Sequence, residues 1–234
     1  IARAHLRDAI TDNPVSSSQA LDAPTQQPRS RSLIETAAPP LFFASGFAAL
    51  SYQMAWQRAL FGWYGVDLDS VSVIVSVFML GLGGGALLGG WLADRFPRRR
   101  FLVFALVELT IGLFGAVSLD VIDACGALFS SQPLPVMIAA TFALLMIPTF
   151  AMGATLPVLL TELASRLGNV GLSTGSLYRV NTLGAAVGAL ASAVVVLPLF
   201  GLDGLTAVAA LLNIGVAGVA ALASLRERGQ EAGR

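Results

Sequence analysis

Long apolar segments separated by short polar stretches dominate the chain after residue 40. Each segment is close to the roughly 20 residues that an α-helix needs to cross the hydrocarbon core of a bilayer. The pattern predicts six membrane-spanning helices, at residues 41–60, 70–92, 101–119, 135–162, 177–199 and 203–224. The predicted fold class is therefore all-α, a polytopic bundle of six transmembrane helices that occupies residues 41–225.

Both ends of the chain are polar. Residues 1–40 are rich in Ser, Gln, Pro, Asp and Arg, and such a segment buries too little apolar surface to offset its chain entropy. We expect a cytoplasmic tail that is disordered unless a partner orders it, with a short helix over residues 2–10 as the alternative. Residues 226–234 predict a second, short cytoplasmic tail. The sequence begins with Ile1 rather than Met, so it leaves undecided whether another segment precedes it.

Composition agrees with a membrane protein. Charged residues make up 12% of the chain, against roughly 25% in soluble domains. One cysteine, Cys125, excludes an internal disulfide, and one histidine, His5, leaves no cluster of His and Cys to hold a metal. Phosphate-binding loops, Ser/His/Asp sets and zinc-protease motifs do not occur in the sequence. We therefore expect no cofactor and no enzymatic activity.

The arginines predict an orientation. All 14 basic residues are arginines, and those beyond residue 60 follow mainly the second, fourth and sixth predicted spans: Arg95, Arg98, Arg99, Arg100, Arg166, Arg226, Arg228 and Arg234. The alternate connections, at residues 66–69, 120–133 and 201–203, carry aspartates and no arginine. Cytoplasmic loops are enriched in Lys and Arg, so both termini are predicted to be cytoplasmic in a bacterial-type inner membrane. The arginine blocks lack interleaved aromatics, which argues against a nucleic-acid partner.

Small residues recur every fourth position in two spans. The second span carries Gly81, Gly85 and Gly89, and the fifth carries Gly184, Gly188 and Ser192. Residues four apart lie on one face of a helix, and small side chains there let a second helix approach closely. The two stripes are predicted helix-packing surfaces.

The loop after the second span resembles the one between the second and third helices of major facilitator transporters, G-x-x-x-D-[RK]-x-G-[RK]-[RK]. The matching residues are Gly90, Asp94, Arg95, Arg98 and Arg99, with Pro97 in place of the second glycine. A packing stripe followed by an orientation signal would account for much of the same pattern, and we favour that interpretation.

Few polar side chains lie inside the predicted spans, where they are costly and usually find partners in the bundle interior. The candidates for an intramembrane polar or transport site are Tyr52, Gln53, Arg58, Glu108, Asn181 and Asn213. Glu108 is the deepest carboxyl group, so we expect it to be protonated or hydrogen-bonded by Tyr, Gln or Arg. It is either a proton or cation site or, as we favour, a clasp between helices. Glu162 and Arg179 lie at similar depth and are predicted to pair.

The fourth span contains Pro148, Gly153 and Pro157, so its backbone hydrogen-bond ladder is interrupted within the membrane. Transporters use broken helices to bind substrate at mid-membrane, but prolines also occur in membrane helices without a functional role. We favour a simple kink.

Six blocks in order, at residues 45–58, 81–100, 107–113, 148–157, 177–189 and 197–204, resemble the membrane region of the fused major-facilitator-like/spermidine-synthase-like family. The resemblance implies a bundle like one half of a major facilitator transporter. The family's first block reads Y-E-x-x-W-x-R, so Tyr52, Trp56 and Arg58 match and Gln53 replaces the glutamate. In the family a synthase domain follows the membrane part. The printed sequence ends at Arg234, before such a domain, so we do not expect the synthase reaction from these residues.

Three functions are compatible with these features. The first is a non-catalytic membrane subunit or anchor that packs against partner helices in a larger complex, respiratory or photosynthetic ones included. The second is a half-transporter that dimerises with a second copy of itself and moves a polyamine or another small cation. The third is the membrane fragment of a longer fused protein. Lipid is a partner in every case.

Overall fold

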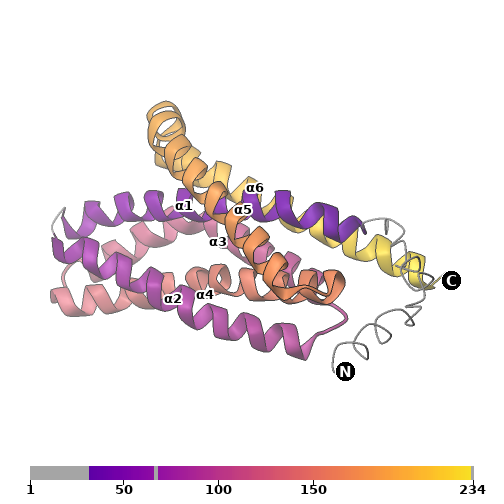
Figure 1. The fold of residues 1–234 in the computed structure, drawn as a ribbon. Coiled ribbons are helices and arrows are strands. Elements are labelled where there is room, and N and C mark those ends of the chain that lie inside the picture. Colours follow the sequence, from indigo (N-terminus) through magenta and orange to yellow (C-terminus); the bar gives the residue numbers. More distant parts are fainter. Residues whose placement is uncertain (1–31, 66–67, 233–234) are drawn as a thin grey trace, which may run out of the picture. The chain divides into compact units, whose positions relative to one another are not determined.

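A computed structural model describes residues 32–65 and 68–232 (Figure 1). They form α1 (Leu33–Tyr64), α2 (Leu68–Arg95), α3 (Arg100–Phe129), α4 (Leu134–Leu167), α5 (Val170–Ala191), the π-helical turn η1 (Ser192–Val196) and α6 (Leu197–Ala232). These residues contain helices and no strand, so the predicted all-α class is confirmed. His5 and the expected tail up to residue 31 lie outside the described residues.

Five stretches of the described chain are long and apolar enough to cross a membrane, rather than the six predicted. They are Leu33–Trp63, Ile74–Arg95, Arg100–Phe129, Leu134–Leu167 and Val170–Gly229. The count differs because the last stretch runs through α5, η1 and α6 as one helical segment of 60 residues. At Gly201 the backbone leaves the helical region, with φ 68° and ψ −167°. Figure 1 shows the chain turning back on itself in this part of the fold.

The first helix begins earlier than the apolar pattern predicts. Ser32 caps α1: its Oγ accepts a hydrogen bond from the Glu35 N–H, and the Glu35 carboxylate accepts one from the Ser32 N–H, both at 3.2 Å. This reciprocal pair satisfies donors that a helix start leaves open. Pro39 and Pro40 lie inside α1. Residues 33–40 therefore extend the first helix, although their polarity had assigned them to the tail.

The third and fourth predicted spans compare differently with the structure. Helix α3 continues to Phe129, so Asp123 and Cys125 lie in a helix and not in a loop. Helix α4 contains Pro148 and Pro157 and forms a single helix from Leu134 to Leu167, so the alternative of a broken helix is not observed, and the favoured kink stays a prediction. The Thr161 hydroxyl donates to the carbonyl oxygen of Pro157 at 2.7 Å, which engages a backbone acceptor in the turn after the second proline.

Helix pairing brings segments far apart in sequence side by side. Helix α2 packs mainly on α4, α3 on α6 and α4, and α1 on α5 and α6. Two buried clusters hold these pairs together: one surrounds Tyr52, Trp56 and Phe78, and the other surrounds Phe42 and Phe104. Large apolar side chains also cover the outside, as Leu87 at 79% and Leu128 at 71% exposed illustrate. An apolar exterior of this kind suits a bundle that contacts lipid.

Candidate functional site: a buried carboxyl group beside a central cavity

Glu108 lies in the interior of the helical bundle and is fully buried. The Ser45 hydroxyl on α1 donates a hydrogen bond to Glu108 Oε1 at 2.6 Å, and the Asn213 Nδ2 on α6 donates to Oε2 at 2.5 Å. Both donors are uncharged, and both ion pairs of the described residues involve Arg166 rather than Glu108. Ser45, Glu108 and Asn213, which we call the central triad, thus join three helices through one carboxyl group.

The sequence of α3 explains why these groups meet. Phe104, Glu108 and Ile111 lie on one face of α3 and are all buried, as their spacing of three or four residues requires. Gly112 follows on the same face. A Cβ atom at Gly112 would lie 2.9 Å from Ile214 Cγ1 and 3.2 Å from Asn213 Cβ. The missing side chain therefore lets α6 bring Asn213 within reach of the carboxyl group.

A cavity of about 130 Å³ adjoins the central triad. The helices α1 to α6 each contribute to its lining, which consists of Ser45, Gly46, Ala49, Leu50, Leu82, Ile111, Met152, Thr155, Asn181, Ala185 and Asn213. The Asn213 Oδ1 is buried and accepts no hydrogen bond from the described residues. A water molecule needs roughly 10–15 Å³ of such volume, so the cavity has room for several waters or a small organic group.

The other polar residues of the first span do not join this triad. Tyr52 and Trp56 are fully buried and stack with ring centroids 5.1 Å apart. The Trp56 indole N–H donates to Ser118 Oγ at 2.8 Å. The Tyr52 hydroxyl is buried against Gly115 and has no hydrogen-bond partner among the described residues. Gln53 is half-buried and Arg58 is exposed, so neither is a partner of Glu108.

Both small-residue stripes pack against helices of the same chain. Gly81, Gly85 and Gly89 lie against Thr149, Phe150 and Ala154 of α4, where added side chains would collide with side-chain or backbone atoms. In α5, Gly184 and Gly188 lie against the backbone of Phe43 and Phe47, and the Ser192 hydroxyl donates to Ser51 Oγ at 2.9 Å. These surfaces are occupied, so they do not supply a free docking face for another protein.

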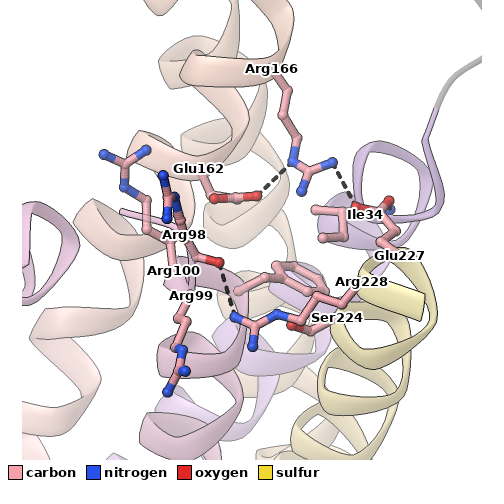
Figure 2. Close-up of a pocket in the computed structure, with 10 residues that line it drawn as sticks. Ile34, Arg98, Arg99, Arg100, Glu162, Arg166, Ser224, Glu227 and Arg228 are labelled. Carbon is pink, nitrogen blue, oxygen red and sulfur yellow. Dashed lines mark hydrogen bonds and ion pairs between the residues drawn. The ribbon is translucent and has the colours of Figure 1, made fainter. Parts of the chain in front are cut away.

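The arginine-rich loop and the ends of several helices form a second polar region (Figure 2). Arg166 pairs with Glu162 at 2.6 Å and with Glu227 at 2.8 Å. Glu162 therefore pairs with Arg166, one turn away on α4, instead of with Arg179, which is exposed on α5. The predicted pair of Glu162 with Arg179 is therefore wrong, because Arg166 lies nearer to Glu162.

The residues that resemble the major facilitator loop lie at the end of α2 and in the turn after it. Asp94, Arg95, Arg98 and Arg99 are exposed. The Arg95 guanidinium lies 5.8 Å from the ring centre of Phe96. A Cβ atom at Gly90 would meet open space, so no close approach requires glycine there.

Sequence reasoning missed several members of the site. Ser45, Thr155 and Gly112 are small residues inside apolar helices, and nothing local distinguishes them from packing residues. Ser45 does lie within the first of the family-like blocks, at residues 45–58. That position was the one available signal, because the pairing of α1 with α3 and α6 cannot be read from the sequence.

Comparison with known proteins assigns the chain to a family. The family model of the Major Facilitator Superfamily matches residues 32–234. Polyamine aminopropyltransferases of Mycobacterium tuberculosis (strains H37Rv and CDC 1551) and Mycobacterium bovis are 27% identical over 187 residues, which cover 78% of this chain and 35% of each relative. The chain thus spans about a third of the length of these curated relatives. No solved structure matches it. On the extent of the family match, the chain belongs to the Major Facilitator Superfamily.

Proposed function

We propose that the chain is a transporter-type membrane module that binds a proton or a small organic cation at Glu108. The single observation that carries this proposal is the fully buried carboxyl group, held by two neutral donors beside a cavity of about 130 Å³. Intramembrane acidic residues are expensive and commonly mark ion pathways.

The surroundings of Glu108 favour a cationic ligand over a purely structural clasp. A negative charge at this position has no cationic partner among the described residues. A proton or an ammonium group would neutralise that charge, and isolated buried charges are strongly disfavoured. The unpaired Asn213 Oδ1 adds an acceptor beside the same cavity, and an ammonium group offers several N–H donors.

The relatives suggest which organic cation to try first. Their name refers to polyamines, which are flexible chains carrying ammonium groups. This chain shares 27% identity with them over the matched residues. We therefore take a polyamine as the first candidate ligand, with a proton as the coupling or alternative ion.

We further infer that the chain crosses the membrane six times, with both described ends at the cytoplasmic side. The Ile34 N–H at the start of α1 donates to Glu227 Oε1 near the end of α6 at 3.1 Å, so the two ends lie together, and this supports an even number of crossings. The stretch Val170–Gly229 has 60 residues, which is about 90 Å of helix, enough to cross the bilayer core of about 30 Å twice. The break at Gly201 divides this stretch into two crossings, which with the four other stretches gives six.

A second half completes the proposed transporter, because major facilitator transporters contain two six-helix halves. We propose a second copy of the chain in this role. Arg179 is exposed on α5, roughly 14 Å of helix from its start, although charged side chains rarely face lipid. A partner surface or a water-filled space beside α5 would satisfy its guanidinium.

Flux measurements test the proposal. The full chain is reconstituted in proteoliposomes, and uptake of radiolabelled putrescine and spermidine, together with internal pH, is followed with and without a proton gradient. We expect saturable uptake, or proton flux, that Glu108→Gln reduces by at least about tenfold, in line with loss of a charged interaction. Arg58→Gln, at an exposed position, is the matched control and should retain flux. Absence of any flux in the folded wild-type protein would contradict the proposal.

The membrane-subunit hypothesis predicts a different outcome. That hypothesis assigned the glycine stripes to partner helices, and these stripes face the chain's own helices. The exposed Arg179 is compatible with a foreign partner as well as with a second copy of the chain. Mass measurement of the complex extracted in mild detergent separates the two ideas, because a dimer of this chain supports the transporter and a stable assembly with other proteins supports the subunit.

A further inference from the structure

A cavity of about 60 Å³ lies at the arginine-rich end of the bundle (Figure 2). The loop after α2 and the ends of α1, α3, α4 and α6 line it with Ile34, Arg98, Arg99, Arg100, Phe101, Glu162, Arg166, Ser224, Glu227 and Arg228. Five arginines and two glutamates leave a surplus of three positive charges around it. The central cavity has no comparable charge, so this is a separate site.

The two glutamates are already engaged. Both accept hydrogen bonds from the Arg166 guanidinium, at 2.6 Å for Glu162 and 2.8 Å for Glu227. Glu227 also accepts from the Ile34 backbone N–H. Their negative charges therefore hold Arg166 and the start of α1 in place. The side chains of Glu162, Glu227 and Arg166 together carry one net negative charge, against four positive charges on the remaining arginines.

Backbone contacts orient two of those remaining arginines. The Arg100 Nε donates to the Ala93 carbonyl oxygen at 3.0 Å, and the Arg228 Nη2 donates to the Arg98 carbonyl oxygen at 3.0 Å. Each guanidinium has five N–H donors, so most of its donors remain available. The side chains of Arg98 and Arg99 make no hydrogen bond or ion pair with any described residue.

The start of α3 adds to the positive potential. Arg99 occupies the N-cap position and makes no side-chain cap hydrogen bond, in contrast to the capped start of α1. The first N–H groups of a helix attract anions when no side chain caps them. Arg99, Arg100 and Phe101 all line the cavity, so the uncapped helix start and the arginines meet at the same place.

We propose that this cavity binds a phosphate group. Guanidinium groups match phosphate oxygens through paired hydrogen bonds, and a phosphate can contact several of them at once. The same chemistry is offered by an anionic phospholipid headgroup and by a free phosphate ion. Basic pockets at the cytoplasmic ends of membrane helices are suited to lipid headgroups. Binding would tie the α2–α3 loop to the ends of α4 and α6.

Two binding measurements distinguish the sources. In the first, the purified full chain is titrated with inorganic phosphate in detergent, and thermal unfolding is the readout. In the second, the chain is incorporated into nanodiscs of phosphatidylcholine with or without phosphatidylglycerol, and the retained lipid is counted by native mass spectrometry. The test variant is the double change Arg98→Gln and Arg99→Gln. Both side chains are exposed, so the fold should survive. Arg58→Gln is the control, since Arg58 is exposed and does not line this cavity.

We expect the double variant to bind phosphate groups at least about tenfold more weakly than the wild type, as loss of charge-assisted hydrogen bonds implies, with the control unchanged. Loss seen in both measurements supports the shared phosphate chemistry, and loss seen with phosphatidylglycerol alone assigns the site to a lipid headgroup. Loss seen with inorganic phosphate alone assigns it to a free ion. Equal binding by the wild type, the double variant and the control would overturn the proposal.

Discussion

Glu108 is the residue at which the packing of the bundle and the proposed transport function coincide. Its two hydrogen bonds join α1, α3 and α6, as an interhelical clasp would. Both of its hydrogen-bond partners line a cavity, and the carboxyl group lacks a basic partner among the described residues. The clasp and the cation site, which sequence reasoning treated as alternatives, are therefore compatible in one geometry. The transport flux of the Glu108→Gln variant distinguishes the two roles, because Gln preserves the shape of the side chain and removes its charge.

Glycine positions differ sharply in what they tolerate. A Cβ atom at Gly85 would collide with the backbone of Phe150, whereas one at Gly90 would meet open space. We expect Gly85→Ala to push α2 away from α4 and to lower the free energy of unfolding by about 1–3 kcal/mol, as overpacking does. Gly90→Ala, five residues further along the same helix, should have no such effect. Equilibrium unfolding in mixed micelles measures both, and equal stability of the two variants would contradict the packing argument.

At the scale of elements, the apolar pattern located the apolar part of each described α-helix, but it predicted neither the helix ends nor the continuity of α5, η1 and α6. The length of an apolar segment marks only the part of a helix that fits the bilayer core. Helices α1 and α3 continue beyond that part, because capping and packing outside the core also stabilise helical structure. Ser32 and Glu35 form a capping box that the sequence does contain. The polar composition of residues 1–40 concealed it, since composition averages over the local spacing that a cap requires.

Gly201 is the element-scale feature with the clearest test. Its φ of 68° and ψ of −167° fall in a region that is essentially restricted to glycine. We expect Gly201→Ala to destabilise the turn by about 1–3 kcal/mol and to increase hydrogen exchange around it. Gly215 lies within helical backbone with open space at its Cβ position, so Gly215→Ala should be neutral or stabilising. Similar exchange in both variants would mean that the break at Gly201 is not required.

At the scale of the whole molecule, the fold class and the membrane character could be predicted because they depend on composition and segment length alone. The central triad could not, because Ser45 and Asn213 are 168 positions apart in the printed sequence and only the pairing of α1, α3 and α6 brings them together. The pairing of Arg166 with Glu227 was missed for the same reason. Contacts between distant helices depend on which faces meet, and single-sequence periodicity does not specify this.

Topology is the whole-molecule prediction. Single cysteines are placed by Leu33→Cys, Ser131→Cys and Arg226→Cys in a Cys125→Ser background, at positions that are all exposed. A membrane-impermeant maleimide applied to spheroplasts should label Ser131→Cys at once and the other two only after lysis. The physical reason is that Leu33 and Arg226 neighbour the joined residues Ile34 and Glu227. Labelling of Leu33→Cys and Arg226→Cys from opposite sides would contradict an even number of crossings.

The way α2 meets α4 has a mechanical consequence. Gly85 and Gly89 lie against backbone atoms of α4, and Gly153 of α4 lies against the backbone of Leu82. At these positions the two backbones are in direct contact, so the helices have no room to approach each other further. We expect the two helices to move as one block. In the proposed two-copy transporter, alternation between inward and outward openings would then come from rocking of this block against the second copy.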